Sequence, residues 1–229
     1  MAAVKFADQE FPEQNCAIYN KQKKVFLDIS SHEDPQGKLK SFLLSNFSFD
    51  GKRILEAGAG AGRITDYYID RAGSVILTDA NKPMVDILTK KYGAGNNAAA
   101  VRCLHKDLKK QFSGTFDIFL CAFSFGYGLE PEIRDYDSYL EKILPAARQH
   151  IIIECTGIYD MYDCLDPETI LFDQALERRF QKKEILTDFV FPSPEQAYEA
   201  AGILFPAVAE RVKQENRAVI PDRITVFYD

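Results

Sequence analysis

The chain has 229 residues, of which 46% are hydrophobic and 27% charged, and its formal net charge is −6. That length suits one α/β domain, and the acidic balance disfavours a nucleic-acid partner, whose phosphates need many Lys and Arg side chains. No run approaches 18 apolar residues, and the first fifteen residues carry charges where a signal peptide needs an apolar run. We therefore expect a cytoplasmic protein with no membrane partner.

Cysteine and histidine usage gives no sign of a metal site. The five cysteines are scattered without a C-x-x-C pair, and the three histidines lie far apart in the sequence. This pattern indicates reduced thiols and no metal ligand set.

The first 49 residues are expected to form a helical cap. Two helices are predicted near residues 13–28 and 36–47, joined by a loop that reads SSHEDPQG. They precede the first strand and could fold over one edge of the sheet.

From residue 52 onward, short apolar segments alternate with segments of helical spacing, which predicts a doubly wound, mostly parallel sheet. Continuous apolar character is typical of parallel strands buried on both faces. Asn81 and Ser193 are expected to cap the helices that follow them, and Ile170 and Leu171 to be buried. The predicted strands are residues 53–57, 74–79, 100–105, 116–123, 150–156, 184–191 and 224–229, with a helical insert at 193–217.

Residues 54–65 read ILEAGAGAGRIT, which places three glycines at alternate positions between a strand and a helix. Such a turn lets a ligand approach the backbone, and the following helix start favours an anionic group. A dinucleotide site needs G-x-G-x-x-G, but the third glycine position is Arg63. Glu56, just before the glycines, would repel a pyrophosphate and would suit a ligand that carries an ammonium group.

The segment resembles the first motif of class I S-adenosylmethionine-dependent methyltransferases. VILTDAN, HKDL and FDIFLCAFSFGYG resemble the next three motifs, so the likeness covers roughly residues 50–160. It implies a single domain with seven strands in the order 3-2-1-4-5-7-6, the last antiparallel. Within this domain, residues 1–49 form the cap, 50–160 the cofactor core and 161–229 the C-terminal half. The implied cofactor residues are Glu56, Gly58, Ala59, Gly60, Asp79, Ala80, Asp107, Leu108 and Cys121.

The implied roles match the donors and charges of S-adenosylmethionine. Asp79 would accept hydrogen bonds from both ribose hydroxyls, and Asp107 would accept one from the adenine amino group. Glu56 would face the methionine ammonium. The backbone N–H of Leu108 would reach the adenine ring. Three structural alternatives stay open: a buried acid at Glu56, a helix cap at Asp79 and a simple loop acid at Asp107.

The methyl acceptor is expected above the ends of the fourth and fifth strands, where Tyr127 and Glu154 are pocket candidates, with Tyr19 from the cap. The fourth motif lacks the Asp/Asn-Pro-Pro-aromatic pattern used on base amino groups. A small-molecule acceptor is therefore expected, with protein or RNA as the alternative. The catalytic residue is unassigned. A non-catalytic S-adenosylmethionine-binding module and, last, a dinucleotide-dependent reductase remain as other functions.

Overall fold

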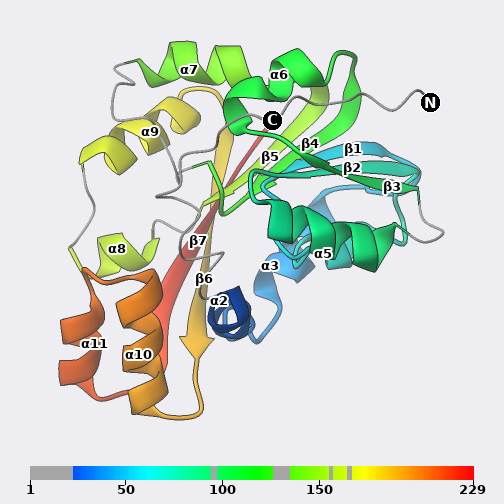
Figure 1. The fold of residues 1–229 in the computed structure, drawn as a ribbon. Helices are drawn as coiled ribbons and strands as arrows, with labels where there is room; N and C mark the ends of the chain where they lie inside the picture. Colours follow the sequence, from blue (N-terminus) through cyan, green and yellow to red (C-terminus); the bar gives the residue numbers. More distant parts are fainter. Residues whose placement is uncertain (1–22, 94–96, 126–134, 155–156, 164–166) are drawn as a thin grey trace.

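The computed structural model describes residues 23–93, 97–125, 135–154, 157–163 and 167–229. These residues form one seven-stranded sheet in the order β3-β2-β1-β4-β5-β7-β6, with helices on both faces (Figure 1). The sheet is parallel from β3 to β5, and β7 runs antiparallel between β5 and β6, which confirms the predicted order. The strands are β1 (Arg53–Ala57), β2 (Ser74–Asp79), β3 (Ala98–Arg102), β4 (Phe116–Ala122), β5 (Ala147–Glu154), β6 (Gln181–Val190) and β7 (Val219–Tyr228).

The burial of each strand explains how well its predicted first and last residues agree with the structure. β1 and β4 are buried at nearly every position, as expected for central parallel strands. β6 is an edge strand that begins with four exposed residues, so no apolar run announces its start at Gln181. β3 ends at Arg102, three residues earlier than predicted, because a 3-10 turn, η1 (His105–Asp107), follows it.

Two clusters of buried hydrophobic residues cover the two faces of the sheet. Helices lie over both faces (Figure 1). Short helix α6 (Leu108–Gln111), α7 (Tyr136–Ile143) and α9 (Pro167–Glu177) lie on one face, where Leu140 and Phe172 pack against Phe119 of β4. On the other face lie α3 (Lys38–Asn46), α4 (Thr65–Tyr68) and α5 (Lys82–Tyr92).

The buried face of α9 differs from the prediction. Ile170 and Leu171 are exposed, whereas Phe172, Ala175 and Leu176 are buried against the sheet. The helix is apolar on more than one side, so its periodicity alone did not identify the face that packs. None of the described helices is both long and apolar enough to cross a lipid bilayer.

A third cluster surrounds the far ends of β6 and β7. It contains Ile29 of α2 (Lys23–Ser30), Ile158 of α8 (Gly157–Met161), and residues of α10 (Pro194–Leu204) and α11 (Ala209–Glu215). The predicted insert is therefore two helices. Ser193 caps α10 by accepting from the backbone N–H of Gln196, as predicted. Asn81 stands at the start of α5 without the predicted side-chain cap: its amide nitrogen donates to Asp79 at 3.2 Å, and its Oδ1 accepts no hydrogen bond from the described residues.

The antiparallel pair of β6 and β7 extends beyond the carboxyl ends of the parallel strands. β5 ends at Glu154, opposite Thr225 of β7, whereas residues 219–224 of β7 pair only with residues 185–190 of β6. The segment between α2 and α3 docks on this overhang: Asp34 N donates to the Asp188 carbonyl at 3.0 Å, and Val190 N donates to the His32 carbonyl at 3.0 Å. The cap is thereby held beside the end of the sheet where the glycine turn lies.

The Asp34 side chain makes several of the hydrogen bonds that attach this segment to β6 and α3. Its carboxylate accepts from the backbone N–H groups of Lys38 and Leu39, at 2.9 and 2.8 Å, and from the Thr187 hydroxyl at 3.0 Å. The residue is 7% exposed and has a φ of 51°, a left-handed conformation that Asp tolerates better than most residues. One buried side chain thus caps α3 and joins it to β6.

We expect Asp34→Ala to lower the free energy of unfolding by about 2–3 kcal/mol, because a helix cap and a buried charged hydrogen bond are both lost. Asp34→Asn should cost less, since its amide oxygen can still accept and Asn tolerates the left-handed conformation. Urea unfolding followed by circular dichroism measures both. Asp86→Ala, at an exposed acid paired only with Lys82, is the control. An equal loss in the control would contradict the assigned role.

Candidate functional site

The turn after β1 has a backbone that only glycine adopts easily. Gly58, Gly60 and Gly62 have φ values of 65°, 56° and 83°, all in the left-handed region. Side chains with a Cβ are strained there. The alternate spacing of the three glycines is therefore explained by local geometry before any ligand is considered.

The three glycines differ in what surrounds them. A Cβ on Gly58 would overlap the Ser124 side chain, and one on Gly62 would overlap the Tyr92 ring. A Cβ on Gly60 would meet nothing within 4 Å. Gly58 and Gly62 thus permit close packing inside the protein, and Gly60 is the position at which a ligand can approach the backbone.

Asp79, at the end of β2, lies directly beside this opening. Its Oδ2 accepts from the backbone N–H of Gly60 at 2.9 Å, and its Oδ1 accepts from the backbone N–H of Asn81 at 2.8 Å. The side chain is nearly buried, which raises the pKa of the carboxyl, while these hydrogen bonds oppose the rise. A carboxylate has about four acceptor positions, so Asp79 keeps capacity for a further donor next to Gly60.

The loop after β3 supplies a second acceptor. Oδ2 of Asp107 is buried and accepts no hydrogen bond from the part of the chain that the structure describes. Such an atom fits a ligand donor, for example an amino group. The backbone N–H of Leu108 donates to the His105 carbonyl within η1, and the Ala80 carbonyl accepts from Arg102 at 3.0 Å. The N–H that was expected to reach adenine is thus used within the protein.

Glu56 has the contacts of a buried structural acid, one of the two roles considered from the sequence. It is 1% exposed, and its Oε2 accepts from the Thr65 hydroxyl at 2.6 Å and the Tyr68 hydroxyl at 2.5 Å. Burial raises the pKa of Glu56 to about 7, although both hydrogen bonds lower it. The side chain joins β1 to α4 and so fixes the two ends of the glycine turn.

The remaining sequence-predicted positions divide into buried residues and residues outside the described ranges. Cys121 is fully buried in the core, where burial and then the nearby Glu154 and Glu56 charges raise the pKa of its thiol. Ala59 and Glu154 are also buried. Ala59 closes the turn by donating its N–H to the Thr78 carbonyl at 2.8 Å. Tyr127 and Tyr19 lie outside the described residues.

The end of β4 places further side chains beside the glycine turn. Phe123 has a φ of 54°, an unusual conformation for an aromatic residue and one that is enriched at functional sites. Ser124 lies 3.1 Å from Nε2 of His105, measured from its Oγ. Burial lowers the pKa of His105 to about 4, so its imidazole is neutral at pH 7.

Arg63, which replaces the third glycine of a dinucleotide turn, connects the turn to the cap. Its Nη2 lies 2.9 Å from Oε2 of Glu33, and its guanidinium lies 4.7 Å from the centre of the Phe123 ring. Glu33 belongs to the SSHEDPQG loop and matches no motif. Only the folded chain brings it to the glycine turn.

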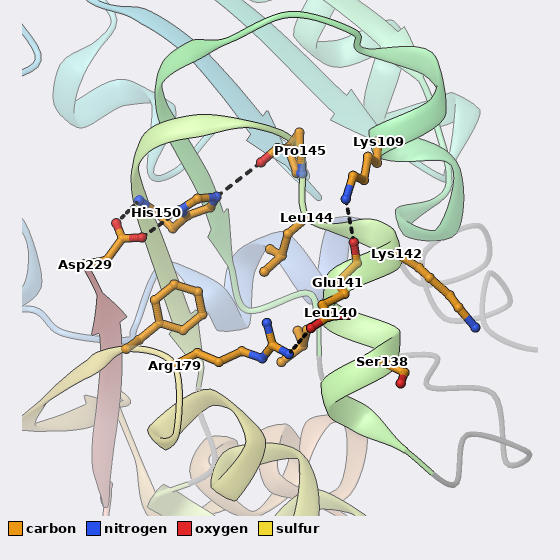
Figure 2. A pocket seen from close by; sticks show the side chains of 11 residues that line it. Lys109, Ser138, Leu140, Glu141, Lys142, Leu144, Pro145, His150, Arg179 and Asp229 are labelled. Carbon is orange, nitrogen blue, oxygen red and sulfur yellow. Dashed lines mark hydrogen bonds and ion pairs between the residues drawn. The ribbon is translucent and has the colours of Figure 1, made fainter.

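A hollow of about 900 Å³ lies at the opposite end of the sheet. Figure 2 shows His150 between Asp229 and Pro145, and both Lys109 and Arg179 directed at Glu141. These polar groups are satisfied by one another. The hollow contains none of the sequence-predicted site residues and adjoins the amino end of β5, whereas ligands of open α/β sheets bind at the carboxyl ends.

Comparison with known proteins agrees with this geometry. Residues 54–146 match the family model of a methyltransferase domain. The chain is similar in structure to a candidate methyltransferase from Bacillus halodurans C-125 (12% identity, 82% of this chain and 96% of that chain, TM-score 0.53). It is also similar to the YcgJ protein from Bacillus subtilis (12% identity, the same two coverages, TM-score 0.54). The family model thus covers the part of the chain that holds the glycine turn, and these two solved structures share its fold.

A curated relative is the cypemycin N-terminal methyltransferase of a Streptomyces species, which is 32% identical over 91 residues. The match covers 39% of this chain and 36% of that relative. It therefore spans little more than a third of either protein.

We expect Glu56 to make the free energy of unfolding fall as pH rises from about 5 to 7. In this window the folded protein holds a proton on Glu56 that the unfolded chain, with an ordinary pKa of 4.5, has lost. The difference between about 7 and 4.5 corresponds to roughly 3 kcal/mol. Above about pH 7 the contribution is constant, because both states are ionised.

Glu56→Gln should remove this slope, as measured by urea unfolding at pH 5, 6 and 7 without ligand. His105, with its lowered pKa, contributes in the opposite direction, so the informative quantity is the difference between wild type and variant. Glu199→Gln, at an exposed acid on α10, is the control. The same slope in wild type and Glu56→Gln would show that Glu56 is ionised throughout the window.

Proposed function

We propose that this protein transfers a methyl group from S-adenosylmethionine, bound at the glycine turn, to a small-molecule acceptor. The observation that carries the proposal is the open backbone at Gly60 beside the Asp79 carboxylate. Free space at a glycine backbone, next to a hydrogen-bond acceptor, suits a large ligand that carries hydroxyl donors. The match of residues 54–146 to a methyltransferase-domain model supports this cofactor over a dinucleotide, as does Arg63 at the third-glycine position.

When bound, S-adenosylmethionine supplies an electrophilic methyl group on a sulfonium, so the protein need only align the acceptor and exclude water. Asp79 would accept from a ribose hydroxyl with its remaining acceptor capacity. Asp107 would accept from the adenine amino group with its buried, unpartnered Oδ2. Glu56 would act indirectly, by holding the glycine turn through α4.

A peptide amino terminus is the second candidate acceptor. The relative that matches 91 residues is named as an N-terminal methyltransferase, which favours this acceptor over RNA. The acidic net charge also disfavours RNA. Because the match spans only a third of each protein, the acceptor has to be tested directly.

The first test separates the proposed functions. Isothermal titration with S-adenosylmethionine, S-adenosylhomocysteine and NAD⁺ should give binding of the first two only. Release of S-adenosylhomocysteine over a panel of metabolites and short peptides then reports turnover. Binding without turnover would favour a non-catalytic module, and binding of NAD⁺ alone would favour a reductase.

Asp79→Ala should weaken S-adenosylmethionine binding by at least roughly tenfold, because a hydrogen bond to a charged acceptor is worth about 1.5–3 kcal/mol. The variant also loses the link to the Gly60 backbone, so the loop itself is less ordered. Titration calorimetry measures the affinity, and Asp86→Ala on α5 is the matched exposed control. An unchanged dissociation constant for Asp79→Ala would remove this residue from the site.

Gly60→Ala should impair cofactor binding while leaving the fold intact. Its Cβ would enter the open space beside Asp79, and its φ of 56° costs about 1 kcal/mol of stability. Gly37→Ala is a matched control, because Gly37 has a φ of 65° and also meets nothing within 4 Å, but it begins α3. Thermal unfolding should shift similarly for both variants, and calorimetry should find weaker binding only for Gly60→Ala. Equal affinities would contradict the assigned ligand path.

A further inference from the structure

Glu33 lies at the same end of the sheet as the glycine turn. It forms a β-bridge with Phe189 of β6, within the part of the β6–β7 pair that extends past the end of β5. Arg63, directly after the glycines, reaches it with a 2.9 Å ion pair. The cap therefore places a carboxylate beyond the carboxyl ends of the central strands, where the methyl acceptor is expected.

Half of this carboxylate is unsatisfied. The Glu33 side chain is 5% exposed, and its Oε2 pairs with Arg63. Its Oε1 is buried and accepts no hydrogen bond from any described residue. The neighbouring Asp34, also buried, differs in accepting three hydrogen bonds. A buried oxygen of a carboxylate without a donor is costly, so its retention calls for a donor that arrives with a ligand.

The charges around Glu33 favour a cationic donor. Glu33 and Asp34 are adjacent buried acids, and Arg63 is the cation that pairs with Glu33. Burial raises the pKa of the Glu33 carboxyl, the Arg63 ion pair lowers it, and the nearby Asp34 charge raises it again. Phe123, beneath the Arg63 guanidinium, and the half-buried Tyr67 add aromatic surface to the same cluster.

We propose that Oε1 of Glu33 binds the amino group of the methyl acceptor, so that the acceptor is an aliphatic amine. The amine could belong to a small molecule or to a peptide amino terminus, since both present the same N–H donors. This inference rests on the proposed methyltransferase function and adds the substrate class and its anchoring residue.

The same contact would prepare the amine for alkylation. An ammonium group has no lone pair, and one proton must leave the nitrogen before it can form a bond to carbon. The Glu33 carboxylate can take that proton at Oε1, which leaves a neutral amine and a neutral carboxyl group. Arg63 remains on Oε2 and keeps the side chain in position.

The test is titration calorimetry of the protein saturated with S-adenosylhomocysteine. The probes are n-butylamine, 1-butanol, trialanine and N-acetyltrialanine. Binding of either amine, with neither 1-butanol nor N-acetyltrialanine bound, is expected. A response to n-butylamine alone indicates a small-molecule acceptor, and one to trialanine alone indicates a peptide terminus.

Glu33→Gln should raise the dissociation constant of the bound amine by roughly 10- to 100-fold, as expected for loss of one charge-assisted hydrogen bond. Glu33→Asp, which keeps the charge, should recover part of this affinity. Glu199→Gln should bind as wild type does. Affinity for S-adenosylhomocysteine should be unchanged in all three variants, which shows that they are folded.

Failure of the two proposals can be told apart. No binding of S-adenosylhomocysteine to wild type would defeat the proposed function itself. If S-adenosylhomocysteine binds but neither amine does, only the role of Glu33 is overturned. The same holds if the amine binds Glu33→Gln as tightly as it binds wild type. A fall in thermal stability of Glu33→Gln with unchanged amine affinity would likewise assign Glu33 to structure alone.

Discussion

The hydrogen bond from the Gly60 backbone to the Asp79 carboxylate is the interaction on which the candidate site depends. It joins the turn after β1 to the end of β2, two adjacent strands whose carboxyl ends meet at one edge of the sheet. The bond requires Gly60 to present its N–H from a left-handed conformation, which glycine alone adopts without strain. The same geometry leaves the outer side of Gly60 open. Gly60 therefore both donates the hydrogen bond that holds the turn and leaves space for a ligand.

Buried carboxylates shape the site, and their hydrogen-bond partners separate structural from functional ones. Asp34 is fully used as a helix cap and a link to β6, and Glu56 accepts from two hydroxyls of α4. Asp107 and Glu33 each retain a buried oxygen without a donor in the described part of the chain. Because desolvating such an oxygen costs free energy, a ligand that supplies a donor at either position would gain from the contact.

The antiparallel end of the sheet extends the site outward. β5 ends at Glu154, but the antiparallel pair β6 and β7 continues beyond it, with α10 and α11 connecting the two strands at the far end. This overhang gives the N-terminal cap an edge to pair with, and the pairing brings Glu33 to Arg63. The proposed acceptor side thus combines residues from the two ends of the chain, next to the glycine turn between them.

The sequence by itself determined the alternation of strands and helices and the glycine turn, because these follow from local periodicity and spacing. The family resemblance over roughly residues 50–160 implied the strand order and the roles of the acids around the turn. The sequence did not determine which glycine opens to a ligand, since that depends on Ser124 and Tyr92 arriving from β4 and α5. Nor could it find Glu33, whose loop carries no motif and reaches the site only through pairing with β6 some 155 residues later. Local backbone preferences are encoded in neighbouring residues, whereas the partners of a buried side chain are chosen by packing between segments far apart in the chain.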